Sequence, residues 1–182
     1  MAKSDEELVS QAQAGDEDAF DELVARHQDR VFALSFRILA NAEDAADVQQ
    51  ETFVRAWTRL KTFKCQAAFS TWVHKITVNL CLSRKRRQTI VEPLDEERLS
   101  PAESGAVACM QRTETKAVVQ AAISELPPHY RVLIVLREIE GRSCEEIGSI
   151  VGRSADSVRT GLYRARRLLK DKIRPYLEEV DS

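Results

Sequence analysis

The sequence is poor in the residues that build sheets and tight turns. Aromatic residues make up 6% of its 182 residues, and only 6 residues are glycine. Ala, Leu, Glu and Arg are abundant instead, and these favour helices, whereas strands favour aromatic and β-branched side chains. Apolar residues make up 43%, which is enough to bury a core. We therefore expect an all-α protein of one or two small domains.

Cysteine and histidine are also scarce and scattered. The four cysteines, Cys65, Cys81, Cys109 and Cys144, form no CxxC pair, and the three histidines do not cluster with them. Zinc sites and disulfide frameworks need such residues at characteristic spacings. The sequence therefore predicts no metal site, no disulfide and no cofactor, and its free thiols suit a reducing compartment.

Long apolar runs and enzyme motifs are absent as well. No stretch approaches the roughly 18 apolar residues of a membrane span, and the acidic N-terminus lacks the apolar segment of a signal peptide. The sequence has neither a glycine-rich phosphate loop nor a nucleophile motif. We expect a cytoplasmic protein that is not an enzyme.

The formal net charge of −2 hides a strong asymmetry along the chain. Residues 1–22 hold one lysine and eight carboxylates, a net charge of −7. Residues 153–174 hold eight lysines and arginines against two aspartates, a net charge of +6. A polyanion responds to the local patch more than to the total charge, so the C-terminal segment is predicted to bind nucleic acid.

Four helices are expected in an N-terminal domain, residues 1–87. Residues 4–7 (SDEE) form a capping box that predicts the first helix start, and Gly15 ends this helix. Apolar residues at helical spacing predict further helices over 17–39, 42–60 and 70–87. Residues 61–69 show no clear period and are predicted to form a loop.

A second helical domain is expected over residues 106–182. The stretch before it, 88–105, contains two prolines and loses the helical pattern, which is typical of a flexible linker. Helices are predicted over residues 106–124 and 128–139, in a short segment between Ser143 and Gly152, and from 155 to about 171. The expected fold is two small helical domains joined by a flexible linker.

The last two helices have the pattern of a helix-turn-helix. A capping box at residues 143–146 (SCEE) opens the short helix, Gly152 turns the chain, and Ser154 caps the long helix. The inward face of the long helix is predicted to hold Val158, Leu162, Ala165, Leu168 and Leu169. Its outward face holds Arg159, Tyr163, Arg166 and Lys170, flanked by Thr160, Arg164 and Arg167. Arginine can pair with guanine in the major groove and lysine with phosphate, so this helix is predicted to read duplex DNA.

The helix predicted over 42–60 presents polar residues on one side. Asp47, Gln50 and Glu51 lie at i, i+3 and i+4, with Asp44 one turn earlier. A fixed acidic and amide surface suits docking against a basic partner. The aromatic residues of this helix, Phe53 and Trp57, are predicted to lie in the core. The aromatic residues of the last helix of the domain are predicted to lie there too.

Both halves resemble the extracytoplasmic-function (ECF) sigma factors of the sigma-70 family. The segments that resemble its region 4 are residues 126–131 (LPPHYR), 145–147 (EEI) and 157–166 (SVRTGLYRAR). The segments that resemble its regions 2.2 to 2.4 are residues 44–57, residues 69–79 (FSTWVHKITVN) and the basic run 84–87. Two signatures in this order, separated by a linker, are more specific than either alone.

The resemblance implies an alternative sigma factor that binds RNA polymerase core and directs promoter-specific transcription initiation. Region 4 would then read the −35 element through Ser157, Arg159, Thr160, Tyr163, Arg164, Arg166 and Arg167. Region 2.2 would bind the coiled coil of the β′ clamp through Asp44, Asp47, Gln50 and Glu51. Regions 2.3 and 2.4 would recognise the −10 element through Phe63, Asn79, Arg84, Arg86 and Arg87.

The −10 assignment has a physical basis in how opened DNA is held. A protein stacks and hydrogen-bonds an extruded base in a pocket and places cations on the phosphates. Phe63 would form a wall of that pocket, and Asn79 carries both a donor and an acceptor for a base edge. The arginines at the end of the helix would contact phosphate.

The expected partners are core RNA polymerase, through its β′ clamp helices and β flap, promoter DNA, and an anti-sigma factor. In this family the anti-sigma factor is often membrane-anchored. An alternative is a self-sufficient helix-turn-helix regulator whose N-terminal half senses a signal or dimerises. That alternative explains the last helix but not the surface formed by Asp47, Gln50 and Glu51.

Overall fold

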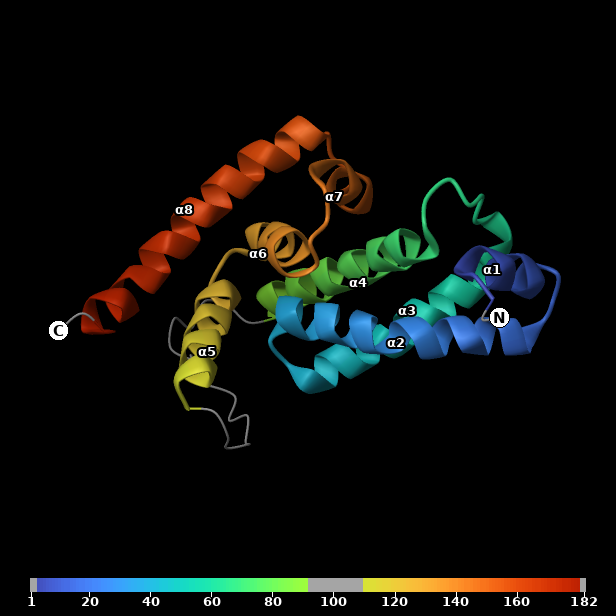
Figure 1. Ribbon diagram of the computed structural model, residues 1–182, viewed down its shortest axis with the longest axis horizontal. Helices are drawn as coiled ribbons and strands as arrows, with labels where there is room; N and C mark the ends of the chain where they lie inside the picture. Colours follow the sequence, from blue (N-terminus) through green and yellow to red (C-terminus); the bar gives the residue numbers. More distant parts are fainter. Residues whose placement is uncertain (1–2, 92–109, 181–182) are drawn as a thin grey trace.

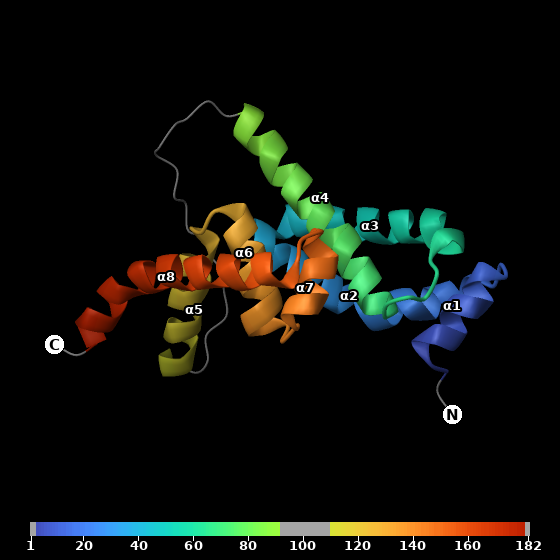
Figure 2. The same cartoon turned by 90° about the horizontal axis from the view of Figure 1, so that it is seen from above.

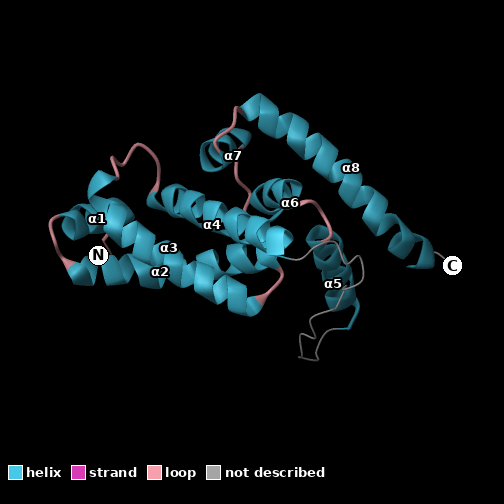
Figure 3. Ribbon diagram, turned by 180° about the vertical axis from the view of Figure 1, so that it is seen from behind, coloured by secondary structure: helices cyan, strands magenta, loops and turns pink. Residues whose placement is uncertain are grey.

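The computed structural model describes residues 3–91 and 110–180, and the side chains of residues 3–88 and 117–174. All regular elements within these ranges are helical (Figure 3), as the composition predicts. The first four helices are α1 (Asp5–Gln13), α2 (Glu17–Leu39), α3 (Ala42–Arg59) and α4 (Phe69–Val91). The last four are α5 (Met110–Ser124), α6 (Pro128–Ile134), α7 (Cys144–Val151) and α8 (Ala155–Val180).

Side-chain caps define where several helices begin. The hydroxyl of Ser4 accepts a hydrogen bond from the backbone N–H of Glu7, whose carboxylate accepts one from the Ser4 N–H. Ser143 and Glu146 repeat this arrangement at the start of α7. Each capping box satisfies two backbone donors that a helix start leaves unpaired, and both predicted boxes are confirmed.

Several helix ends differ from the prediction. The segment after α3 continues as a 3₁₀ turn, η1 (Leu60–Thr62), and α6 continues as a π-helical turn, η2 (Val135–Ile139). Helix α4 extends to Val91, because the first helix-breaking residue after it is Pro93. Helix α8 extends to Val180 and includes Pro175, although a proline lacks the backbone N–H that a helix interior uses. The rest of the predicted linker lies outside the described residues.

Helices α1 to α4 form one packed unit, in which α2 lies against α1, α3 and α4. Its core holds large side chains with almost no exposed surface, such as Leu23, Leu34 and Ile38. Helices α5 to α8 form a second unit, in which α8 packs on α5, α6 and α7. In Figure 1, α8 runs along one side of the molecule, far from α1.

The two units also touch each other. Helix α4 packs against α6 and α7, and α2 packs against α5 and α6 (Figures 1 and 2). Arg131 of α6 is buried at this junction, with 6% of its surface exposed. Its guanidinium donates to the carbonyls of Ile38 (2.6 Å) and Leu126 (3.1 Å) and to that of Ser124. This side chain therefore caps the carboxyl ends of both α2 and α5, where carbonyl groups lack helical partners.

A second set of polar contacts lies where α7 meets the start of α4. Arg142 donates to the hydroxyl of Ser70 and lies 3.4 Å from Nδ1 of His74, and it forms an ion pair with Glu146. His74 is 1% exposed. Burial, and after it the positive charge of Arg142, lowers the pKa of His74 to about 4. The imidazole is therefore neutral at physiological pH.

Some residues that the pattern placed in the core are exposed. Trp57 is 39% exposed and packs on Phe20 with ring centroids 4.8 Å apart, so it covers the rim of the core. Ile139, which helical spacing also places on the buried face of the helix predicted over 128–139, is 39% exposed, because it ends the π-helical turn η2, whose wider turn shifts the helical register. Leu168, predicted on the inward face of the last helix, is 37% exposed. Phe53 is buried, as predicted.

The thiols within the described residues are unpaired. Cys65 is exposed, Cys144 is half-buried, and Cys81 is buried, which raises the pKa of its thiol to about 12. Cys109 lies outside the described residues. The side chains that the structure describes contain no cluster of three or more potential metal ligands.

Candidate functional site

Helices α7 and α8 form the helix-turn-helix that the sequence predicts. Gly152 ends α7 with a φ of +70°, a left-handed conformation that glycine adopts readily. A Cβ atom added to Gly148 would lie 2.6 Å from the carbonyl oxygen of Arg153, so this glycine allows α7 to approach the turn closely. Val158, Leu162 and Ala165 are buried and attach α8 to the unit. The spacing of α7 and α8 is thus fixed by close packing.

The predicted reading face of α8 is exposed. Tyr163 is 70% exposed, and the side chain of Arg159 is 56% exposed. The other residues predicted to contact the −35 element are exposed too: Ser157, Thr160, Arg164, Arg166 and Arg167. The face is therefore free to enter a DNA groove.

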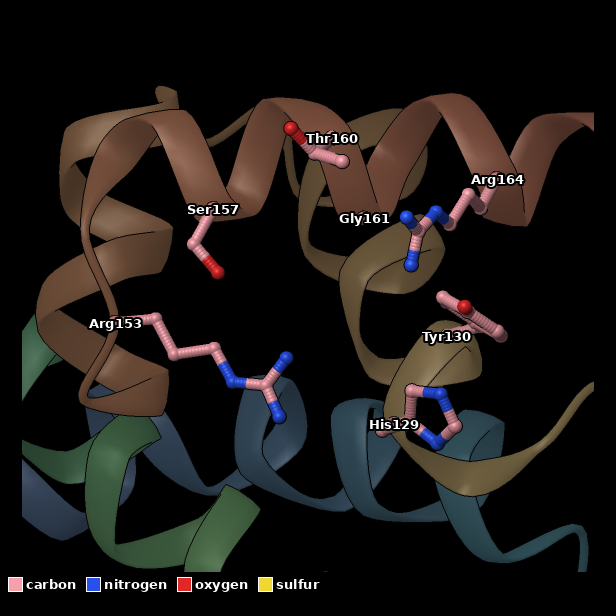
Figure 4. Close-up of a pocket in the computed structure, with 7 residues that line it drawn as sticks. All are labelled: His129, Tyr130, Arg153, Ser157, Thr160, Gly161 and Arg164. Carbon is pink, nitrogen blue, oxygen red and sulfur yellow. The ribbon is translucent and has the colours of Figure 1, made fainter.

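A pocket of about 630 Å³ lies between α8 and the start of α6 (Figure 4). The guanidinium groups of Arg153 and Arg164 both extend into it in Figure 4. The residues that line it are His129, Tyr130, Arg153, Ser157, Thr160, Gly161 and Arg164. Two guanidinium groups beside hydroxyl and imidazole donors make this pocket suited to an anion such as a DNA phosphate.

The sequence reasoning missed three residues of this pocket, His129, Tyr130 and Arg153. Arg153 had a visible signal, because a basic residue in the turn of a helix-turn-helix lies near the reading helix. His129 and Tyr130 lie at the start of α6, in the segment 126–131 that resembles region 4, but no pattern in the sequence places them beside α8. Partial burial and, after it, the charge of Arg153 lower the pKa of His129.

The basic residues of α8 fall into two groups. Arg159 pairs with Asp156 (Nη1 to Oδ1, 2.5 Å) and with Glu145 of α7 (Nη2 to Oε1, 2.8 Å). Arg166 donates from Nε and Nη2 to one carboxylate oxygen of Glu138, at 3.0 and 2.7 Å. Among the side chains that the structure describes, three other basic residues of α8 form no ion pair: Arg164, Arg167 and Lys170.

A second surface lies on α3, in the other unit. The side chains of Asp47 and Glu51 are 56% and 47% exposed, and Gln50 is exposed beside them. Val54, one turn further, is 63% exposed. Asp44 differs, because its side chain is only 15% exposed. The outer stripe of α3 is therefore Asp47, Gln50, Glu51 and Val54.

Arg84 of α4, predicted to contact −10 DNA, pairs with two carboxylates of α3 that were predicted to bind polymerase. Its Nη2 lies 2.6 Å from Oδ1 of Asp44 and 2.9 Å from Oδ2 of Asp47. Gln88 also donates to Asp44, at 2.9 Å. Although partial burial acts in the opposite direction, the two carboxylates raise the pKa of Arg84. Arg84 therefore braces α4 against α3 in this structure.

The loop before α4 is organised by aromatic stacking. Phe63 stacks on Trp72 with ring centroids 4.7 Å apart and an interplanar angle of 24°, and it meets Phe69 edge-on at 6.3 Å. The amide of Gln13 in α1 donates to the carbonyls of Leu60 and Phe63, each at 2.8 Å. The start of the loop is thus fixed to both α1 and α4.

A cavity of about 250 Å³ lies beside Phe63. The residues that line it are Asp5, Glu6, Val9, Phe63, Cys65, Gln66, Ala67, Ala68 and Phe69. Aromatic walls with carboxylate and amide edges can stack and hydrogen-bond a planar polar ring. The sequence identified Phe63 but not the contribution of α1, whose lining residues Asp5 and Glu6 are 58 and 57 positions away from it in the chain.

The carboxylate of Asp5 at this cavity is held in place from α2. It accepts hydrogen bonds from His27 (2.6 Å) and Arg26 (3.1 Å). Burial alone would raise its pKa, but these hydrogen bonds and charges lower it below the ordinary value. Asp5 therefore stays ionised.

The remaining residues predicted to contact the −10 element lie along α4. Asn79 is exposed, as are Arg86 and Arg87 nearer the end of the helix. In Figure 2 this end of α4 projects beyond the other helices. A strand of DNA can therefore reach these side chains. None of the helices in residues 3–91 and 110–180 is long and apolar enough to cross a membrane.

Comparisons with known proteins match both helical units. A family model described as Sigma-70 region 2 matches residues 23–90, and one described as Sigma-70, region 4 matches residues 116–169. The ECF RNA polymerase sigma factor SigE of Mycolicibacterium smegmatis is 36% identical over 166 residues, which cover 89% of this chain and 64% of SigE. The RNA polymerase sigma-H factor of Pseudomonas aeruginosa is 33% identical, with 98% of each chain covered.

A solved structure extends the likeness to three dimensions. CnrH, in complex with the cytosolic domain of CnrY, matches with a TM-score of 0.68 and 27% sequence identity. The match covers 96% of this chain and 97% of that chain. Both helical units therefore have a counterpart in one known protein.

Proposed function

Because the chain belongs to the extracytoplasmic-function sigma factors, which bind RNA polymerase core and direct promoter-specific transcription initiation, we propose how its two units divide this work. The helix-turn-helix of the α5–α8 unit, helices α7 and α8, reads the −35 element. The α1–α4 unit binds core polymerase and the −10 element. The exposed basic face of α8 supports this division most directly, since it lies in the opposite unit from the acidic stripe of α3.

On the −35 element, Arg159 is the principal base reader. An arginine that projects from a reading helix can donate two hydrogen bonds to guanine. Thr160 and Tyr163 lie beside it for contacts with base edges and methyl groups. Ser157, Arg164, Arg166 and Arg167 contact phosphate, with Arg153 and Arg164 enclosing one phosphate in the pocket of Figure 4.

Substitution Arg159→Ala should relax the base preference at one or two −35 positions by about tenfold, because a bidentate pair contributes roughly 1–3 kcal/mol of discrimination. Holoenzyme reconstituted from the full chain and core polymerase would be tested on promoters that carry each base at each −35 position. As a control, Arg167→Ala should weaken binding to all sequences alike. If Arg159→Ala also weakens all sequences alike, Arg159 contacts only phosphate.

On core polymerase, the stripe of Asp47, Gln50, Glu51 and Val54 binds the basic coiled coil of the β′ clamp. Exposed carboxylates steer association, and the exposed valine adds apolar contact area at one end of the stripe. Asp44 is largely covered, so its proposed role is to hold Arg84 and thereby align α4 with α3. This role replaces the direct contact with polymerase that the sequence suggested.

Charge reversal at Glu51 should weaken binding to core polymerase by about tenfold or more, because it places a cation against a basic partner. Binding of the full-length Glu51→Lys variant to core would be measured by fluorescence anisotropy at two salt concentrations. Asp21→Lys is the matched control, since Asp21 is an exposed carboxylate of α2 outside the stripe. An equal loss of affinity for core polymerase in both variants would show that binding depends only on the net charge of the chain.

On the −10 element, the cavity beside Phe63 accepts one extruded base, and Asn79 contacts the edge of another. Aromatic walls make stacking favourable for any base, while the polar edge adds hydrogen bonds. Arg86 and Arg87 hold the phosphates of the opened strand. Arg84 acts as a brace through its two ion pairs and not as a phosphate ligand.

The similarity to CnrH, solved with the cytosolic domain of CnrY, also supports a protein antagonist for this chain. We expect an anti-sigma factor to bind it and to prevent its association with core polymerase. We further expect the chain to act in the cytoplasm by binding alone, contacting the β flap as well as the β′ clamp. The polymerase then supplies the catalytic chemistry.

A further inference from the structure

We propose that Glu145 is a positioning residue that holds the Arg159 guanidinium in the orientation needed to read a base. This inference rests on the proposed role of Arg159 at the −35 element. It concerns a residue of α7, which the sequence suggested only as part of a helix start.

The geometry around Arg159 fixes its guanidinium at two points. Nη1 pairs with Asp156 at 2.5 Å, and Nη2 pairs with Glu145 at 2.8 Å. Asp156 lies on α8 itself and moves with Arg159, whereas Glu145 lies on α7. A planar group held at both terminal nitrogens by two different helices cannot rotate freely, and its other N–H groups remain available to a base.

The backbone that carries Glu145 is itself rigid. Ser143 and Glu146 cap the start of α7, and Ile147 and Ile150 are buried beneath it. The close approach of Gly148 to the turn fixes α7 against α8. Glu145 therefore offers its carboxylate from a fixed place relative to the reading helix.

Glu145 lies in the first turn of α7, where a carboxylate interacts favourably with the helix dipole, but that position alone does not require a pair with Arg159. The side chains of Glu145 and Arg159 are 65% and 56% exposed, and such exposed pairs contribute little to stability. A negative charge beside a DNA-reading helix also repels phosphate and so weakens binding. The benefit that the pair itself adds is orientation, because a side chain that is ordered before binding loses less conformational freedom when it binds.

The other cations of α8 show the contrast. Within the described side chains, Arg164, Arg167 and Lys170 form no ion pair. A phosphate contact needs positive charge but little directional precision, whereas a bidentate base contact needs a fixed plane. Arg159 is thus held by two carboxylates, whereas three of the cations suited to phosphate have no such tether in the part of the chain that the structure describes; Arg166, which pairs with Glu138 alone, lies between these cases.

The test compares base preference and overall binding in one assay. Holoenzyme reconstituted from the full chain and core polymerase would be titrated with promoters carrying each base at each −35 position. The chains are the unchanged protein, Glu145→Gln, Arg159→Ala and the matched control Glu138→Gln. Glu138 is a fitting control because it also holds an exposed arginine, Arg166, two helical turns further along α8.

Glu145→Gln should reduce discrimination by about threefold or more at the positions that Arg159→Ala affects, while binding to disfavoured sequences stays equal or increases. Glu138→Gln should leave discrimination at those positions unchanged. If Glu145→Gln increases binding to every sequence by the same factor, Glu145 only screens charge and the inference is wrong. If Arg159→Ala itself changes no base preference, the proposed role of Arg159 fails instead.

Discussion

Replacing Arg131 with leucine is expected to lower the free energy of unfolding by about 3 kcal/mol, because the substitution leaves several buried carbonyls without a donor. In the native protein its guanidinium binds the carbonyls of Ile38, Ser124 and Leu126, which end α2 and α5. Leucine fills part of the volume but donates nothing. Urea denaturation, monitored by circular dichroism, would measure the decrease in the free energy of unfolding.

Arg153→Leu is the matched control for this substitution. Arg153 lies in the same unit and lines the anion pocket, and its exposed side chain forms no hydrogen bond with the other described residues. Its removal should change the free energy of unfolding by less than about 0.5 kcal/mol. An equally small effect for Arg131→Leu would mean that water replaces the lost donors, and that this arginine does not hold α2, α5 and α6 together.

Acidification from pH 6.5 to pH 4 is expected to destabilise the protein by about 3 kcal/mol through His74 alone. Burial first, then the charge of Arg142, lowers the pKa of His74 from 6.5 to about 4. The unfolded chain therefore binds more protons than the folded protein between these values. The stabilisation is complete above pH 6.5 and is lost as the pH falls toward 4.

A His74→Gln variant separates this contribution from the titration of carboxylates. Glutamine retains polar atoms near Ser70 and Arg142 but does not titrate. The free energy of unfolding, measured by urea denaturation at half-unit steps of pH, should fall less steeply in the variant between pH 6.5 and 4. Parallel pH curves for the two proteins would show that His74 is solvated and titrates normally in the folded state.

Local sequence signals predicted the parts of the fold that depend on nearby residues. Both capping boxes, at Ser4 and Ser143, combine side chains three positions apart, so their geometry is set within one helical turn. The glycine that ends α7 is equally local. These signals located the helix-turn-helix, and the 3.6-residue period then separated its buried face from its exposed face.

Contacts between distant segments were not predictable in this way. Arg84 is 40 residues from Asp44, and no pattern along α4 shows that α3 supplies its partners. Trp57 has the apolar character of a core residue, but α1 and α2 leave its ring partly uncovered. The π-helical turn η2 likewise displaced Ile139 from its expected face. Each case depends on how helices meet, which a single helical period does not encode.

The candidate site shows the same limit. Exposed basic residues of α8 were found because they share one helix face, whereas the tether from Glu145 and the pocket residue His129 come from other helices. Family resemblance assigned roles to positions but did not show that Asp44 and Arg84 pair with each other. The structure thus changed the proposed roles of these two residues.

If this chain gives core polymerase its promoter specificity, the two should bind each other and start transcripts together. Core polymerase and the full chain would be passed together over a size-exclusion column, and transcription from a pool of promoter fragments would be measured with and without the chain. We expect the chain to elute with core and transcripts to start from a defined −35 and −10 combination only when the chain is present. A chain that elutes apart from core, or that leaves the set of transcripts unchanged, would contradict this function.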